Sequence, residues 1–277
     1  MNNMIFPLIT EYELKLPYFI VGIGCFYNQE HIIRPHGNPY YQWIQCHQGK
    51  GELLTGGSTY SVDEGQGMLL YPNESHEYYA ISGSWEVDWI VFGGLHIGNF
   101  LKQTADISRS GIYYVSKPEI ILSKMRKALE VEQSDKPMKS LECSRIAYDI
   151  LLDIMKSSSL KKNCSLDHQY NRLKPLFDFI DKNYDGSLTL TDMSNIVGVT
   201  PQHFCTMFKK ATNLRVFEYI NLVRIKKSKE YILQHKNLQI KEIARLSGFA
   251  DVSYFCSQFK KIEKISPNDF RKLHTYD

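Results

Sequence analysis

The sequence predicts an α+β multidomain fold, with an N-terminal β-barrel, a helical segment and a C-terminal all-α domain that holds two helix-turn-helix units. The first observation is an internal repeat, because residues 204–210 (FCTMFKK) return as residues 255–261 (FCSQFKK). The second is a change from short strand-like apolar runs to helical spacing near the middle of the chain. The third is charge: residues 1–165 carry 15 lysines and arginines against 18 aspartates and glutamates, whereas residues 166–277 carry 18 against 12. The basic C-terminal part therefore suits a polyanionic partner.

Residues 1–115 are expected to form the barrel. Short apolar runs at 41–44, 67–71 and 85–92 are separated by turn sequences such as Gly-Lys-Gly and Pro-Asn-Glu. This alternation is typical of many short strands joined by tight turns. A barrel of this size can hold one small ligand.

Residues 116–158 are expected to form two amphipathic helices, because apolar side chains such as Ile121, Met125 and Leu129 recur at helical spacing. Two roles are open for these helices: an antiparallel interface between protomers, or a cover for the open side of the barrel. Of the two, we favour dimerisation. The serine- and lysine-rich stretch that follows, residues 159–170, is expected to be the interdomain linker.

Residues 171–277 are expected to form the domain that binds DNA, with helix-turn-helix units at about 188–210 and 239–261. In each unit an apolar stretch ends in a glycine, which is followed by a short turn and a second helix. A continuous helix over residues 217–234 joins the units, and its length of about 27 Å approaches one turn of B-DNA.

Local signals define the turn of each unit. In the first, Gly198 permits the turn, Thr200 caps the next helix and Pro201 occupies the first helical position, where a missing N–H costs nothing. In the second unit Gly248 and Asp251 take the corresponding places. These second helices are the expected recognition helices.

The outward faces of the two recognition helices supply the candidates for DNA contact, since the phenylalanines spaced four apart in each repeat face inward. The candidates for contact with base edges are Gln202, Cys205, Thr206, Val252, Ser253, Cys256 and Ser257. The candidates for contact with phosphates are Thr200, His203, Lys209, Lys210, Arg224, Lys260, Lys261 and Arg271. Each true phosphate contact steepens the salt dependence of binding by roughly 0.9 in the log-log slope.

The C-terminal sequence carries a dense set of further motifs. They are Ile-Ala at 243–244, Gly-Phe-Ala-Asp at 248–251, Ser-Tyr-Phe at 253–255, Phe-Lys-Lys at 259–261, and Ser-Pro with Phe-Arg within 266–271. Together they resemble the C-terminal pattern of the AraC/XylS family of transcription regulators. The resemblance covers about residues 173–274 and implies seven helices, promoter DNA as a partner, contact with RNA polymerase, and usually activation of transcription.

The sequence departs from that family pattern in two ways. Thr206 and Ser257 stand where the family commonly has an arginine on each recognition helix, which removes two potential readers of guanine. We therefore expect weak direct readout, with Gln202 as the main base contact and adenine as its preferred base. The glycines that usually follow each recognition helix are Asn213 and Lys264 here. Because lysine in a left-handed conformation costs about 1 kcal/mol, we expect a different cap at the second helix.

The N-terminal half resembles the cupin-like sensor barrel of the same family. The resemblance rests on residues 49–52 (GKGE), 60–70, 71–78 (YPNESHEY) and 85–92. It implies a small-molecule effector and, by the same resemblance, a sugar. Sugar pockets stack an apolar sugar face on an aromatic ring while a few polar groups bind hydroxyls. The candidates for ligand binding by motif position are Arg34, His76, Tyr78 and Trp89, to which the sequence itself adds Trp43 and Trp85. For each aromatic residue the alternative role is ordinary barrel core.

Several classes of protein are disfavoured. The histidines of the N-terminal half show no His-x-His spacing, and no nucleophile motif or phosphate loop is present, so we expect no enzyme activity, no catalytic residues, no metal and no cofactor. The six cysteines are scattered, which favours a reduced, cytoplasmic protein over a disulfide framework. No apolar run approaches the ~18 residues of a membrane helix, so no membrane partner is expected. The alternative function is a constitutive dimeric DNA-binding regulator without a small-molecule ligand.

Overall fold

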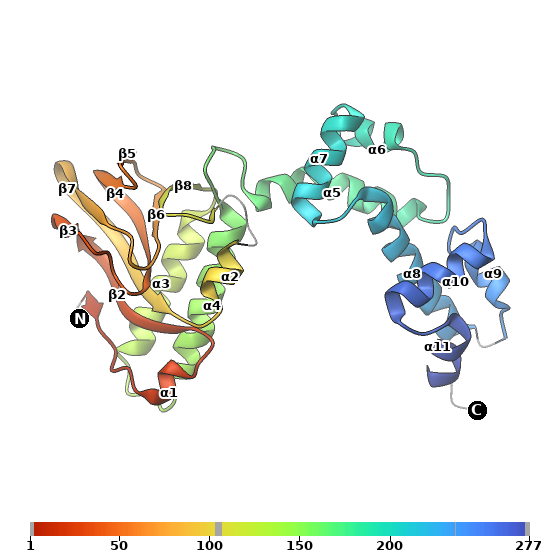
Figure 1. Cartoon of the computed structure of the whole chain (residues 1–277), viewed down its shortest axis with the longest axis horizontal. Helices are drawn as coiled ribbons and strands as arrows, with labels where there is room; N and C mark the ends of the chain where they lie inside the picture. The colour runs from red at the N-terminus through yellow and green to blue at the C-terminus, as the bar shows by residue number, and fades with distance from the viewer. Residues whose placement is uncertain (1–2, 103–106, 236, 275–277) are drawn as a thin grey trace. The chain divides into compact units, whose positions relative to one another are not determined.

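The computed structural model describes residues 3–102, 107–235 and 237–274, and the chain divides into two compact units, Met1–His168 and Gln169–Asp277. The first unit is rich in strands and the second is helical (Figure 1). This arrangement confirms the predicted fold class. In the part of the chain that the structure describes, no helix combines the length and the hydrophobicity that crossing a bilayer requires.

In the described part of the first unit, one antiparallel sheet of nine strands forms the body. Strands β1, β2, β7, β4, β6, β8 and β9 follow one another across it, while β3 pairs with β7 and β5 pairs with β4. The elements up to residue 115 are β1 (Met4–Ile5), α1 (Glu11–Leu14), β2 (Phe19–Asn28), β3 (Ile32–Arg34), β4 (Tyr41–Thr55), β5 (Ser58–Val62), β6 (Gln66–Leu70), β7 (His76–Gly93), α2 (Ile97–Lys102) and β8 (Gly111–Val115).

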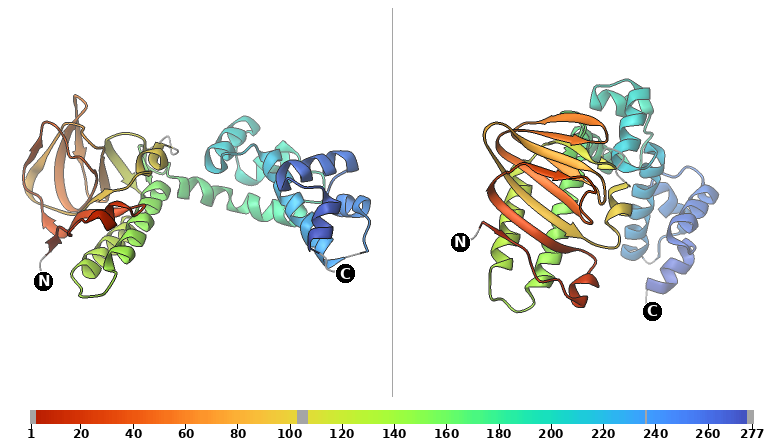
Figure 2. Two further views of the ribbon diagram at one scale, coloured as in Figure 1. Left: turned by 60° about the horizontal axis from the view of Figure 1, so that its bottom comes forward. Right: turned by 60° about the vertical axis from the view of Figure 1, so that its left-hand side comes forward.

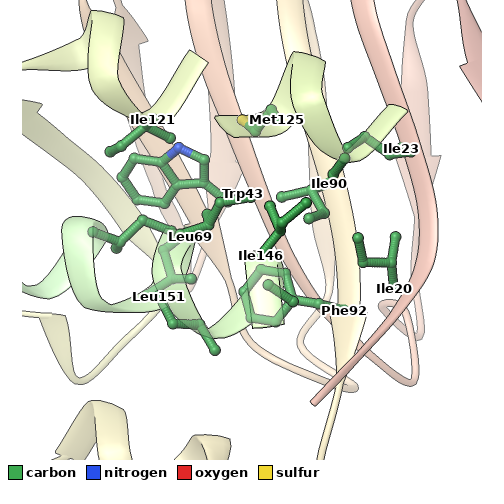
Figure 3. Packing of buried hydrophobic residues seen from close by; sticks show 14 of the residues in the cluster. Ile20, Ile23, Trp43, Leu69, Ile90, Phe92, Ile121, Met125, Ile146 and Leu151 are labelled. Carbon is green, nitrogen blue, oxygen red and sulfur yellow. The ribbon is translucent and has the colours of Figure 1, made fainter. Parts of the chain in front are cut away.

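Helices α3 (Pro118–Glu132) and α4 (Lys139–Ser157) lie against one face of this sheet (Figure 2). Their apolar stripes pack into one buried cluster with sheet residues such as Trp43 and Ile90 (Figure 3). The apolar stripes of α3 and α4, for which the sequence left a dimer interface open, therefore cover the sheet of their own chain.

The stretch expected to be a linker contains regular structure. Ser158 and Ser159 form the short strand β9 (Ser158–Ser159), which pairs with β8. Helix α5 (Leu166–Asn183) begins before the expected end of the linker. A serine-rich sequence does not exclude a strand here, because β8 offers a free edge with which two residues can pair.

Successive residues of β7 point to opposite faces of the sheet, as the pleat of a strand requires. Ile90 and Phe92 belong to the cluster that α3 and α4 cover, whereas Val87 belongs to a second buried cluster on the inner face. Trp89 packs against that second cluster. Neighbouring positions of one strand thus serve the helix layer and the inner face in turn.

The second unit contains the double helix-turn-helix. Its described helices after α5 are α6 (Leu190–Val197), α7 (Pro201–Thr212), α8 (Val216–Gln234), α9 (Ile240–Leu246), α10 (Val252–Glu263) and α11 (Pro267–His274). Together with α5 they make the seven helices that the resemblance implied. Helix α8 joins two separate cores: Ile220 packs with Phe204 and Phe208, and Ile225 packs with Phe255 and Phe259.

The predicted caps are present at both recognition helices. The Thr200 hydroxyl accepts a hydrogen bond from the His203 N–H at 3.3 Å, and the Asp251 carboxylate accepts one from the Tyr254 N–H at 2.5 Å. Asn213 ends α7 in the left-handed conformation, as expected. The expectation of a different cap after α10 is wrong, because Lys264 also adopts a left-handed φ of 68°, and its N–H bonds to the Lys260 carbonyl.

Candidate functional site

The outward faces of α7 and α10 present small polar side chains. On α7, Gln202, Cys205 and Thr206 are exposed, and the Thr206 hydroxyl donates to the Gln202 carbonyl at 3.2 Å. The hydroxyl proton of Thr206 is therefore used within its own helix. On α10, Ser253 and Ser257 are exposed while Val252 and Cys256 are half-buried. Gln202 is the one long amide among these candidates.

The lysine pairs that end the two recognition helices are exposed: Lys209, Lys210, Lys260 and Lys261. Lysines in the last turn also complement the negative end of the helix dipole. His203 is exposed at the start of α7, and the Thr200 hydroxyl beside it serves as the cap.

Two of the candidates for phosphate contact, Arg224 and Arg271, make hydrogen bonds within the protein. The Arg224 guanidinium donates to the carbonyls of Tyr184 at 2.7 Å and Gly186 at 2.9 Å, and burial lowers its pKa. Arg271 donates to the Leu238 carbonyl at 2.6 Å. These donors connect segments of the domain through backbone carbonyls, and a contact of either arginine with phosphate stays a prediction.

Sequence reasoning missed a basic residue beside α7. A hollow of about 600 Å³ lies along that helix, and Arg215 lines it together with Lys209, Lys210 and the half-exposed Phe217. Arg215 precedes α8 as its N-cap residue. The position of this basic residue shortly after the Phe-Lys-Lys motif was the sequence feature that could have identified it as a candidate for DNA contact.

The first unit contains a cavity of about 430 Å³, within the usual range for small-molecule sites. Three of the predicted ligand residues line it: Arg34, Tyr78 and Trp89. The described residues that complete the lining are Met4, Phe6, Val21, Tyr27, Gln29, Ile32, Asn38, Pro39, Tyr40, Gln42, Ile44 and Val91.

The structure places the other three predicted ligand residues elsewhere. Trp43 lies in the cluster beneath α3 and α4, and Trp85 is fully buried, with its indole N–H donating to the Cys46 sulfur at 3.3 Å. His76 is buried beside Tyr78 and borders a different hollow. These two tryptophans take the core role that the sequence left open.

Each tryptophan lies over a glycine of a neighbouring strand. A Cβ atom on Gly24 would lie 2.5 Å from the Trp89 indole nitrogen, and one on Gly51 would lie 2.6 Å from the Trp85 ring. The Trp43 ring contacts Gly67 in the same way. Gly24 thus gives the Trp89 ring a flat support on β2 at the edge of the cavity. The Gly-x-Gly sequence at residues 22–24 could have indicated a place where a large side chain packs on the backbone, but spacing alone does not show that this side chain is Trp89.

Among the described residues that line the cavity, Arg34 is the charged one. Its guanidinium donates to the Gln42 side-chain oxygen at 2.7 Å, which fixes the orientation of both groups. Burial raises the pKa of the neighbouring Tyr78 phenol, while Arg34 acts in the opposite direction. Tyr78 is therefore neutral and able to donate a hydrogen bond.

His76 has a defined tautomer. Its Nδ1 lies 2.8 Å from the Glu74 carbonyl, and since a carbonyl can only accept, Nδ1 carries the proton. Burial lowers the pKa of His76, so the ring is neutral and Nε2 is an acceptor. That Nε2 atom is buried without a described partner.

Comparisons with known proteins identify both domains. The AraC-like ligand binding domain matches residues 16–174, more than half of the chain, and a helix-turn-helix domain matches residues 193–273. The chain is 28% identical over 233 residues to the Msm operon regulatory protein of Streptococcus mutans, with 81% of each chain covered. It is 24% identical over 230 residues to the lactose operon transcription activator of Staphylococcus xylosus, again covering 81% of each.

Among solved structures, the C-terminal domain of the response regulator yesN from Fusobacterium nucleatum is 30% identical, with a TM-score of 0.34, covering 36% of this chain and 98% of that one. The two domain matches and the operon regulators confirm the resemblance and the expectation that the chain is not an enzyme. The chain belongs to the AraC family: it is a DNA-binding transcription regulator that carries the family's ligand-binding domain.

Proposed function

We propose that this regulator activates transcription in response to a sugar bound in the cavity of its first unit. The observation that carries the proposal is Trp89, whose ring rests on Gly24 and lines a cavity that also contains Arg34 and Gln42. An aromatic surface beside a few polar groups is the usual composition of a small-molecule site, and it would allow the apolar face of a sugar to stack on the indole. The lactose operon activator among the relatives supports a sugar and an activating role.

Effector binding is expected to stabilise the protein. A ligand at a hundred times its dissociation constant should raise the free energy of unfolding by about 2.7 kcal/mol. A thermal-shift screen of the full chain against sugars and other small metabolites measures this effect. Trp89→Ala should abolish a hit, because it removes the aromatic surface, while Tyr114→Ala, at an exposed position of β8 outside the cavity lining, should retain it.

A screen without any hit, together with intact promoter binding, would contradict the effector proposal. It would favour the constitutive regulator, controlled by its abundance or by a protein partner. A hit that survives Trp89→Ala would show that the ligand binds elsewhere.

We further propose that DNA is read mainly through Gln202. The exposed amide can bond to N6 and N7 of adenine, a contact of about 1–3 kcal/mol, while the lysine pairs contact phosphates. In a binding selection, Gln202→Ala should weaken the preference for adenine at one position of each selected site. Gln234→Ala, at the exposed end of α8, is the matched control. An unchanged preference in Gln202→Ala would exclude this role.

The proposed partners are promoter DNA, RNA polymerase and a second copy of the chain. The outer face of α4 still offers Leu141 and Tyr148, each 38% exposed, as a small contact surface. Light scattering that finds a monomer at micromolar concentration would remove the homodimer from the proposal.

A further inference from the structure

The cavity contains a positive charge that no described lining residue neutralises. None of the described residues that line it is an aspartate or a glutamate. The groups beside the Arg34 guanidinium are neutral: the Gln42 amide oxygen at 2.7 Å and the Tyr78 phenol. A half-buried guanidinium among neutral groups favours an anion entering the cavity.

The geometry of Arg34 suits a planar or tetrahedral anion. A guanidinium has five N–H donors in a rigid fork, which matches the oxygens of a carboxylate or a phosphate. The bond to Gln42 uses one Nη1 donor and holds the plane of the group in place. Hydrogen bonds between charged partners are about twice as strong as those between neutral ones.

Two further polar side chains in the cavity lining, Gln29 and Asn38, each make a local hydrogen bond. The Gln29 amide donates to the Glu30 carbonyl at 2.9 Å, and the Asn38 side-chain oxygen accepts from the Tyr40 N–H at 2.9 Å. Among the described lining residues Arg34 alone carries a charge, and the remaining lining is mainly aromatic and aliphatic.

We propose that the effector is an anionic carbohydrate, whose ring packs against Trp89 and whose carboxylate or phosphate group binds Arg34. This inference rests on the proposed function, since it specifies the charge of the sugar in the same cavity. Uronic acids and sugar phosphates share the required chemistry, and the test separates them.

The test measures the affinity of the full chain for matched ligands by isothermal titration calorimetry. Each set contains a neutral hexose, its uronic acid and its 6-phosphate, with glucose and galactose as the two parent sugars. The expected result is binding of one anionic member about tenfold more tightly than the neutral parent, the difference between a charged and a neutral hydrogen bond. Whichever anion binds identifies the carboxylate or the phosphate as the recognised group.

Variants of Arg34 assign the effect to its charge. Arg34→Gln should remove the preference for the anion, and Arg34→Lys should retain part of it because the positive charge remains. Arg145→Gln, on an exposed site of α4, should bind as the unmodified chain does. Equal loss of neutral and anionic ligands in Arg34→Gln would overturn the proposal.

The remaining outcomes separate this inference from the proposed function. The anionic effector is overturned if neutral sugars bind more tightly than anionic ones, or if anion binding does not depend on Arg34. A sugar effector is still supported in these cases if the neutral sugars bind. Failure of every neutral and anionic sugar, with DNA binding intact, overturns both.

Discussion

Replacing Gly248 with alanine is expected to destabilise the second helix-turn-helix unit strongly, whereas the same change at Gly198 is expected to cost much less. The two glycines occupy the same place in the repeat and have similar positive φ angles, 84° and 70°. A Cβ on Gly248 would lie 2.6 Å from the Tyr184 carbonyl oxygen and 2.8 Å from the Asp185 Cα. At Gly198 no described atom comes within 4 Å of the added carbon.

The expected costs follow from these surroundings. A left-handed alanine costs about 1–2 kcal/mol at either site. Displacing main-chain atoms adds about 1–3 kcal/mol at Gly248 alone. Gly248→Ala should therefore lower the stability of the second unit by about 2–5 kcal/mol and weaken promoter binding severely.

Denaturant unfolding followed by helical circular dichroism, together with a gel mobility-shift assay, measures both effects. Gly198→Ala is the matched control, since it has the same backbone strain without the collision. Equal losses of stability in the two variants would contradict the role of the Tyr184 contact.

Replacing Arg126 with alanine is expected to destabilise the first unit by about 3–5 kcal/mol, the usual cost of leaving a buried charge without its partner. The Asp88 side chain is fully buried, and its two oxygens accept from the Arg126 Nε at 2.9 Å and the Phe26 N–H at 2.8 Å. Phe26 has a φ of 51°, unusual for an aromatic residue, at an irregularity in the pairing of β2 with β7. The Arg126 guanidinium also lies 4.0 Å from the Phe26 ring centroid.

A matched control is the exposed pair of Arg145 and Asp149 on α4, whose side chains are 66% and 38% exposed. Arg145→Ala should cost less than about 1 kcal/mol, because water screens and replaces that interaction. Thermal unfolding of the three proteins without ligand compares them. A loss in Arg126→Ala no larger than that in Arg145→Ala would show that Asp88 gains a new partner or water when Arg126 is removed.

Local sequence signals were sufficient to predict the helices and turns of the second unit. The repeat, Gly198, Pro201 and the caps at Thr200 and Asp251 each determine a backbone conformation over a few residues, and the structure contains them all. Lys264 was the exception: it adopts the left-handed conformation although the energetic cost for a lysine, considered as an isolated residue, predicted otherwise. Helix α11 docks directly after Lys264, with Phe270 against Phe259, and this packing opposes that cost.

The cavity could be predicted only in part. Arg34, Tyr78 and Trp89 follow from motif position, but Trp43 and Trp85 could not be assigned, because both faces of β4 and β7 are buried and hydrophobicity does not distinguish the inner face from the helix-covered face. The internal bonds of Arg224 and Arg271 depend on residues 33 to 40 positions away in the chain. Sequence spacing gives no sign of such contacts.

The arrangement of the three tryptophans also gives the protein an internal optical probe. Trp43 and Trp85 are fully buried in the two cores, whereas Trp89 lines the cavity. Any ligand that packs on Trp89 changes the polarity around one indole and leaves the other two in place, so a change in intrinsic fluorescence reports occupancy of the cavity over a constant background. The support that Gly24 gives to Trp89 thus makes effector binding observable without a label.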